Sequence, residues 1–239
     1  MNEELKGTLI RSAEALKVDL DNRAIERFSI FMEELQSWNQ RMNLTAITEP
    51  GEIITKHFVD SLTVRPYLEG SKVDLIDIGC GAGFPGIPLL ISDNRIFLTC
   101  LDSLMKRLNF IEQLMPKLEI TQYQCIHGRA EELGRMKEHR EQYDIAVSRA
   151  VAQLSKLLEY CLPLVKKGGK FLAMKGPDYR EEMSDIQKAV KLLGGEIESA
   201  DEITLPLTDM KRSIIAIRKI KPTPQRYPRQ QAKINKMPL

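Results

Sequence analysis

The segment with the clearest chemical potential is a run of alternating glycines, Gly79, Gly81 and Gly83, after an apolar stretch at residues 73–78. The stretch is short and rich in β-branched residues, which predicts a buried strand. Glycine is needed where a side chain would obstruct a ligand or forbid the backbone angles of a turn. Asp102 ends the next apolar stretch, and a carboxylate there can accept both hydroxyls of a ribose. The pattern therefore predicts a nucleoside-containing ligand beyond the carboxyl ends of parallel strands.

Two classes of ligand fit such a loop. Residues 81–86 match the G-x-G-x-x-G pattern of dinucleotide sites, but the match starts late, because the strand already ends at Gly79. Asp77 favours the other class, since its carboxylate would repel a pyrophosphate and attract a ligand carrying an ammonium and a sulfonium. A glycine loop without a ligand would cost chain entropy. We therefore predict S-adenosyl-L-methionine as the cofactor, with an NAD-dependent oxidoreductase as the alternative.

The residues after the fourth predicted strand, Ser148-Arg149-Ala150, bear on the methyl acceptor. Enzymes that methylate exocyclic amines resemble Asn/Asp-Pro-Pro-Tyr there, and this chain does not. Pyrimidine C5 enzymes need a thiolate nucleophile, whereas Cys161 falls on an apolar helical stripe and is expected in the core. Guanine N7 carries an in-plane lone pair and no proton, so alignment with the donor could suffice. Arg149 could bridge cofactor and substrate, bind a phosphate, or form an ordinary ion pair at the strand end.

The elements that must hold these residues change in character near residue 70. Residues 1–68 have the apolar spacing of helices, with Asp21 or Asn22 as an N-cap. Beyond them, short apolar runs alternate with amphipathic helical stretches. This alternation predicts an α/β fold, a doubly wound, mostly parallel sheet with helices on both faces. The predicted strands cover residues 73–78, 96–101, 120–126, 143–147, 170–174, 196–205 and 213–219.

A second polar cluster, His57, Asp60 and Ser61, lies in the helical N-terminal part. On a helix these side chains share one face, because they are three and four residues apart. A hydrolase triad is not expected, since one helix face cannot arrange a relay together with an oxyanion hole. The cluster is therefore either a polar helix surface or a contribution to the site.

Composition is typical of a globular protein. The 239 residues are 43% hydrophobic and 28% charged, enough for one full domain with a sizeable core. No apolar run approaches the ~18 residues of a membrane span, and no secretory signal is recognisable. The four cysteines have neither disulfide nor zinc spacing. We therefore expect a cytoplasmic protein with reduced thiols, no metal and no membrane partner.

Basic residues are concentrated at the C-terminal end. Residues 218–239 contain seven Lys or Arg side chains and no acid, although the net charge of the whole chain is only +2. Four prolines in the same segment disfavour both helix and sheet. An extended arm that binds phosphates is one interpretation, and a solvated terminus is the other.

The loop Asp77-x-Gly79-x-Gly81-x-Gly83, followed by Asp102, resembles that of the class I S-adenosylmethionine-dependent methyltransferases. The resemblance covers about residues 73–220 and implies a seven-stranded sheet whose closing strands add an antiparallel edge. In that family the loop after the third strand flanks the adenine. Here that loop holds Ala130 and Glu131.

A narrower resemblance covers nearly the whole chain. The chain contains, in this order, Asn43-Leu44-Thr45, His57-x-x-Asp60-Ser61, Gly81-Ala82-Gly83-Phe84-Pro85-Gly86, Arg129-Ala130-Glu131, Ser148-Arg149-Ala150 and Arg226-Tyr227-Pro228-Arg229. Together these motifs resemble the bacterial small-subunit ribosomal RNA guanine-N7 methyltransferases, also called glucose-inhibited division protein B. The resemblance implies methylation of one guanine N7 in the decoding region of 16S rRNA. It also implies contacts to the donor from Gly79, Phe84, Ala130, Glu131 and Arg149.

These observations combine into one hypothesis, a 16S rRNA methyltransferase of the small ribosomal subunit with no obligate protein partner. Its parts would be a helical lobe (1–68), a donor-binding core (69–220) and a basic extended tail (221–239). A methyltransferase acting on a protein or small molecule, and an RNA-binding module with a vestigial site, are the alternatives. The assigned residues are Asp77 and Gly81 at the methionine end, Asp102 at the ribose, Ala130 and Glu131 at the adenine, Phe84 as a wall, Arg149 beside the donor, His57, Asp60 and Lys175 where the base enters, and Arg226, Tyr227 and Arg229 on the RNA.

Overall fold

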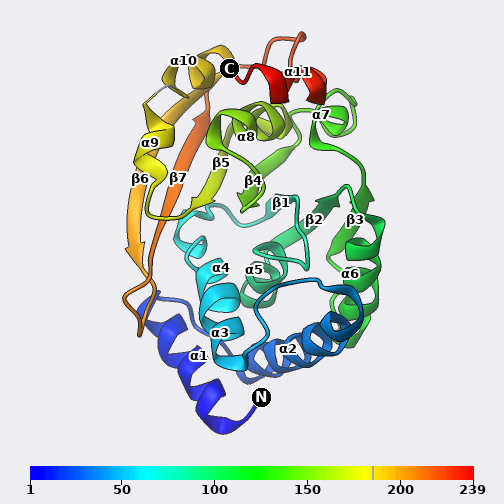
Figure 1. The fold of residues 1–239 in the computed structure, drawn as a ribbon, viewed down its shortest axis with the longest axis vertical. Helices are drawn as coiled ribbons and strands as arrows, with labels where there is room; N and C mark the ends of the chain where they lie inside the picture. The colour runs from blue at the N-terminus through cyan, green and yellow to red at the C-terminus, as the bar shows by residue number, and fades with distance from the viewer. Residues whose placement is uncertain (185) are drawn as a thin grey trace.

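The computed structural model describes residues 1–184 and 186–239 and contains one seven-stranded sheet with the order β3-β2-β1-β4-β5-β7-β6 (Figure 1). The five strands from β3 to β5 are parallel, and β7 runs antiparallel to both β5 and β6. This confirms the predicted doubly wound, mostly parallel fold with an antiparallel addition. The strands are β1 (Val73–Ile78), β2 (Ile96–Asp102), β3 (Tyr123–His127), β4 (Tyr143–Arg149), β5 (Val165–Lys175), β6 (Gly195–Thr204) and β7 (Lys211–Lys219).

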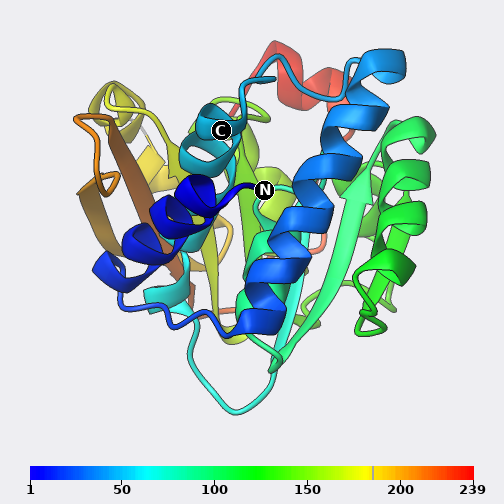
Figure 2. The same ribbon diagram turned by 90° about the horizontal axis from the view of Figure 1, so that it is seen from below.

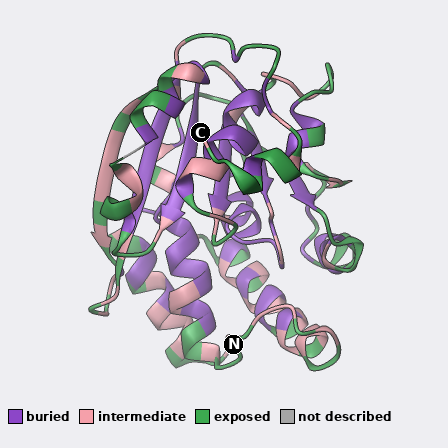
Figure 3. Ribbon diagram, turned by 45° about the horizontal axis from the view of Figure 1, so that its top comes forward, coloured by how far each residue is buried: buried purple, intermediate pink, exposed green. Residues whose placement is uncertain are grey.

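Helices cover both faces of the sheet because successive strand residues alternate between two apolar cores. Leu75 of β1 points into the core beneath α1, α2, α5 and α6, whereas the next residue, Ile76, points into the core beneath α8 and α10. The inner strands are accordingly mostly buried, whereas the edge strands β3 and β6 are partly exposed (Figure 3). The helices of the first face are α1 (Glu3–Ala15), α2 (Asn22–Met42), α5 (Gly86–Ser92) and α6 (Met105–Lys117), and those of the second include α7 (Ala130–Leu133), α8 (Leu154–Cys161), α9 (Tyr179–Met183) and α10 (Ile186–Leu192).

The N-terminal helices share their core with the sheet. Phe28, Phe31 and Phe58 are fully buried and belong to the same cluster as the strand residues Leu75 and Leu98. Figure 2 shows α1 and α2 lying across this face of the sheet. The carboxylate of Asp21 accepts a hydrogen bond from the backbone N–H of Ala24 at 2.7 Å and caps α2, as predicted. The lobe of residues 1–68 is thus a layer of the same domain.

The chain between α2 and β1 is helical but irregular. The short helix α3 (Pro50–Ile53) runs into a π-helical turn, Ile54–Val59, and then into α4 (Asp60–Leu62). Such π-turns are rare and occur often at functional sites. The turn carries His57, and α4 begins at Asp60.

The C-terminal segment is folded rather than extended, which corrects the prediction for residues 221–239. It ends in the short helix α11 (Gln231–Lys236), which packs beside α8 (Figure 1). Ile234 is fully buried and Tyr227 is 7% exposed. The prolines and basic residues suggested a solvated arm, but apolar side chains spaced between them insert into the second core.

Within residues 1–184 and 186–239, no helix has the length and apolarity needed to cross a membrane. The four cysteines are free thiols, and Cys161 is fully buried in the core as predicted.

Candidate active site

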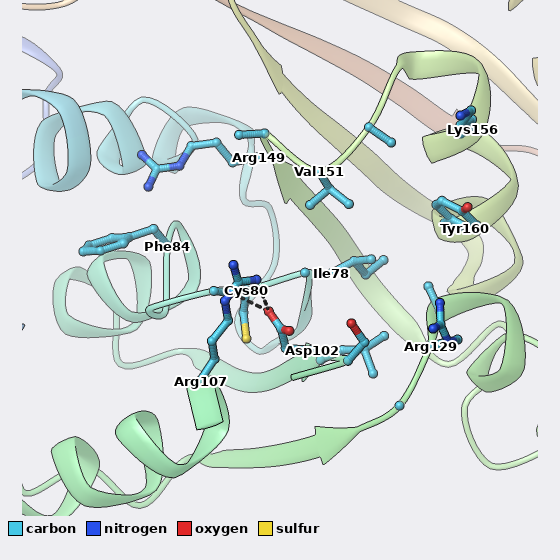
Figure 4. A pocket seen from close by; sticks show the side chains of 18 of the residues that line it. Ile78, Cys80, Phe84, Asp102, Arg107, Arg129, Arg149, Val151, Lys156 and Tyr160 are labelled. Carbon is cyan, nitrogen blue, oxygen red and sulfur yellow. Dashed lines mark hydrogen bonds and ion pairs between the residues drawn. The ribbon is translucent and has the colours of Figure 1, made fainter. Parts of the chain in front are cut away.

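A cavity of about 680 Å³ opens where β1, β2, β3 and β4 end. In parallel sheets this edge is the usual place for a ligand. Phe84 and Arg149 stand at one end of the cavity, Arg129, Tyr160 and Lys156 at the other, and Asp102 between them (Figure 4). The lining residues include Thr45, His57, Ile78 to Ala82, Phe84, Asp102, Arg107, Gly128 to Glu131, Arg149 to Gln153, Lys156, Tyr160, Gln231 and Asn235.

The floor of the cavity is bare backbone. Gly81 has a φ of +59°, and a Cβ built there would meet no protein atom within 4 Å, because it would project into open space. A Cβ at Gly79, where φ is +72°, would lie 2.5 Å from the Val151 side chain. The absence of a side chain at Gly81 therefore leaves room for a ligand, and its absence at Gly79 lets the loop after β4 approach.

Asp102 lies in the cavity as predicted from the end of the second strand. It is 3% exposed, and its Oδ2 accepts hydrogen bonds from the Gly81 N–H at 3.0 Å and from Arg107 at 3.2 Å (Figure 4). Its Oδ1 accepts from the Leu104 N–H at 2.9 Å. These bonds fix the carboxylate beside the glycine floor while leaving it among the cavity-lining side chains.

Asp77, which the sequence analysis assigned to the methionine end of the donor, lies behind the glycine loop and outside the lining of the cavity. Its side chain is fully buried, and Oδ2 accepts a hydrogen bond from the Gly86 N–H at 2.8 Å. Among the described residues, its Oδ1 has no hydrogen-bond partner. Burial raises the pKa of this carboxyl to about 7. An orphaned carboxylate oxygen under bare backbone fits a cationic ligand group above the loop, and it fits a pyrophosphate poorly.

Phe84, which was predicted as a wall of the donor pocket, lines the cavity. Its ring stacks on His57 at 4.3 Å between centroids and on Phe31 at 5.0 Å. The Arg149 guanidinium lies 5.2 Å from the same ring. The wall therefore joins the N-terminal helices to the glycine loop.

Arg149 connects the sheet to the irregular helix. It donates to the Asp60 carboxylate at 2.7 Å, to the Lys56 carbonyl at 3.0 Å and to His57 Nδ1 at 3.1 Å. Arg149 thus forms the strand-end ion pair that was one interpretation and also lines the cavity, while bridging cofactor and substrate or binding a phosphate stays a prediction.

His57 is held neutral in this network. Burial, and secondarily the charge of Arg149, lowers its pKa to about 3. Because Arg149 donates to Nδ1, the ring proton sits on Nε2, which donates to Thr45 Oγ1 at 2.9 Å. Both nitrogens of this neutral imidazole are therefore engaged within the protein.

A second cavity, of about 350 Å³, lies on the other side of Arg149. His57, Asp60 and Lys175 all line it, so the structure brings these three candidates together, while among them only His57 also lines the larger cavity. Lys175 donates to Glu182 and to the Ala152 carbonyl, each at 2.8 Å. The other residues that line this second cavity include Ile47, Lys56, Thr63, Met174, Arg212 and Ser213.

Ala130 and Glu131 begin α7 at the far end of the larger cavity. They are 8% and 7% exposed, and burial raises the pKa of the Glu131 carboxyl. The glycine floor, Asp102 and this pair thus all line the same cavity.

Comparison with known proteins places the chain in a family. A model of rRNA small subunit methyltransferase G matches residues 24–214. The ribosomal RNA small subunit methyltransferase G of Acetivibrio thermocellus is 46% identical over 236 residues, which are 99% of this chain and 97% of that protein. That of Alkaliphilus oremlandii is 46% identical over 238 residues and 99% of each chain. The chain belongs to the rRNA small subunit methyltransferase G family.

The fold has a wider distribution than this methyltransferase G family. The structure of M. jannaschii TYW2 in complex with AdoMet superposes on 67% of this chain and 77% of its own, with a TM-score of 0.52 and 11% identity. At that identity the likeness concerns the fold, which is that of the class I methyltransferases.

Within this family member, the predicted RNA-binding residues of the tail have different surroundings. Arg226 is exposed and stacks over Tyr227, whose own ring is buried. Arg229 is bound to Glu159, which is fully buried. Tyr227 and Arg229 are therefore occupied inside the protein, and a role on RNA stays a prediction for these three residues.

Sequence reasoning gave no role to several cavity residues. Arg107 follows Asp102 by five residues, so a helix starting between them brings the two together. Gln231 and Asn235 come from the tail that the sequence suggested was extended. Their spacing of four around an apolar Ile234 was the available signal of a short helix with one polar face.

Proposed function

We propose that this protein transfers a methyl group from S-adenosyl-L-methionine to N7 of a guanine in 16S rRNA of the small ribosomal subunit, in the cytoplasm. The observation that carries the proposal is the pair of adjoining cavities, one with a bare glycine floor and Asp102, the other lined by Lys56, Lys175 and Arg212. When bound, the donor supplies an electrophilic methyl group on a sulfonium. Family membership supports the ribosomal RNA substrate.

The chain's own residues would hold the donor at three points. The buried Asp77 carboxylate would stabilise the cationic methionine end electrostatically, across the backbone of the glycine loop. Asp102 would accept from the ribose hydroxyls, because its oxygens are fixed by Gly81 and Arg107 at the cavity wall. Ala130 would pack on the purine ring, with Glu131 beside it.

The acceptor would enter through the second cavity. Guanine N7 has a lone pair and no proton to lose, so the protein needs to align it rather than deprotonate it. That requirement agrees with a neutral His57, whose Nδ1 accepts from Arg149 and is not free to act as a base. Lys56 and Arg212, at the rim with Lys175, would meet the RNA backbone, where cations supply affinity without reading sequence.

The experiment offers labelled donor to 16S rRNA, to purified small subunits and to a cell extract. Wild type should label the RNA, at a guanine N7 detected after digestion. Label in a protein or small molecule would overturn the RNA assignment. Stabilisation by NADH but not by S-adenosylhomocysteine would overturn the methyltransferase assignment.

A pair of glycine variants ties the activity to the cavity. Gly81→Ala places a methyl group in the open space above the floor, whereas Gly168→Ala adds one at a positive φ on β5, where it also meets no atom within 4 Å. Each should lose about 1 kcal/mol of unfolding free energy from backbone strain. Only Gly81→Ala should lose donor affinity, by more than about tenfold. Equal donor affinity in the two variants would contradict the proposed floor.

A further inference from the structure

The C-terminal segment takes part in the donor cavity. Gln231 and Asn235 stand in the cavity wall together with Arg129 and Tyr160. They lie four residues apart on α11, so they share one face of that helix. This is the end of the cavity that also holds Ala130.

The segment is fixed in this place by buried contacts. Glu159, fully buried on α8, accepts from the Arg229 backbone N–H at 2.6 Å and from its guanidinium at 2.7 and 2.9 Å. Arg140 donates to the carbonyls of Thr223 and Tyr227 at 2.7 and 2.9 Å. With Ile234 fully buried below α11, these contacts make the helix a built wall of the cavity.

The side-chain amides of Gln231 and Asn235 offer the hydrogen-bond donors and acceptors that recognition of a purine edge requires. Gln231 Oε1 accepts from Arg129 at 2.5 Å, which orients the amide and leaves its NH₂ group as a donor. The Asn235 side chain is exposed and has no hydrogen-bond partner within residues 1–184 and 186–239. Side-chain amides can pair with the amino group and ring nitrogen of adenine.

We infer that α11 completes the purine end of the donor cavity and that the Gln231 and Asn235 amides hydrogen-bond the edge of the adenine. The inference rests on the proposed function, because it takes the ligand to be an adenosine-containing donor. It also gives the tail a different role from the phosphate-binding arm suggested by its charge, since the Arg229 charge is neutralised by Glu159.

The test is calorimetric titration of the full chain with S-adenosylhomocysteine. The double variant Gln231→Ala/Asn235→Ala should bind about tenfold more weakly than wild type, the loss expected from one to two hydrogen bonds. The matched control is Lys233→Ala/Lys236→Ala, which alters exposed positions on the same helix and removes two charges. Its affinity should stay within about twofold of wild type.

A second probe locates the contact. 5′-Methylthioadenosine carries the purine and ribose but no amino acid group, so it should lose the same factor in the double variant. Unchanged S-adenosylhomocysteine affinity, or a loss confined to S-adenosylhomocysteine, would overturn the inference. Failure of wild type to bind either probe would instead overturn the proposed function. If the double variant unfolds at lower urea than wild type without ligand, Gln231→Glu/Asn235→Asp keeps the side-chain volumes and should weaken both probes equally.

Discussion

The buried Asp77 carboxylate should give the ligand-free protein an unusual dependence of stability on pH. Its side chain is fully buried, one oxygen has no partner among the described residues, and its pKa is raised from 3.8 to about 7. A carboxyl with a raised pKa binds its proton more tightly in the folded than in the unfolded state. The stability from that proton is therefore fully present below pH 4 and is lost as pH rises through 7.

The magnitude follows from the two pKa values. Each tenfold change in proton affinity corresponds to about 1.4 kcal/mol, so the whole effect is about 4 kcal/mol. Between pH 5 and pH 8 the loss is about 3 kcal/mol. Asp77→Asn removes the titration. The unfolding free energy of the variant relative to wild type should therefore rise by about 3 kcal/mol across this range, whatever the constant cost of packing the amide.

The assay is urea unfolding of wild type and Asp77→Asn at pH values from 5 to 8, without ligand. Taking the difference cancels the other titrating groups, including His57, whose lowered pKa acts in the opposite direction below pH 6.5. Asp74→Asn is the matched control, because it makes the same chemical change at an exposed position of the same strand. A flat difference for Asp77→Asn would refute the reasoning, since it would mean that the carboxyl is solvated or paired.

Two further outcomes follow from buried titratable side chains. Glu159→Gln should lower the unfolding free energy by about 3 kcal/mol, because it leaves the Arg229 guanidinium without its buried, charged partner. Urea unfolding of the variant and of wild type measures this difference. A loss below about 1 kcal/mol would contradict the role of the pair in holding the C-terminal segment. His57→Gln should lower the methyl-transfer rate without changing the shape of the pH–rate profile between pH 6 and 9. The reason is that a histidine with a pKa of about 3 does not titrate in this range. An inflection that is present in wild type and absent in the variant would contradict this and would assign proton transfer to His57.

The parts of the fold that the sequence predicts well are those set by local patterns. The first strand has the predicted bounds, Val73–Ile78, because a segment rich in branched apolar residues ends at Gly79. The second and fourth strands continue one and two residues past their predicted ends, where Asp102 and Arg149 are still paired with their neighbours. Polar side chains end an apolar run in the sequence, but they do not end backbone pairing.

The parts that could not be predicted depend on contacts between distant residues. The tail is held by a pair 70 residues apart, Glu159 and Arg229, and no local pattern indicates which carboxylate a basic residue will meet. The position of Asp77 has the same origin. The sequence predicts a carboxylate near the end of the strand. Its buried position depends on the return of the loop, which brings the Gly86 N–H to donate a hydrogen bond to the carboxylate.

Arg149 lines both cavities and links them to the irregular helical segment before β1. Three of its five N–H groups have partners on one irregular helical segment: the Lys56 carbonyl, His57 and Asp60. Asp60 is bound on its other oxygen by Arg212 of β7 at 2.9 Å. The guanidinium is therefore held from the N-terminal helices and from the sheet, at a place where it lines both cavities. If donor and acceptor occupy the two cavities as proposed, a side chain so constrained would help to fix their separation, and alignment is what methyl transfer to a protonless nitrogen requires.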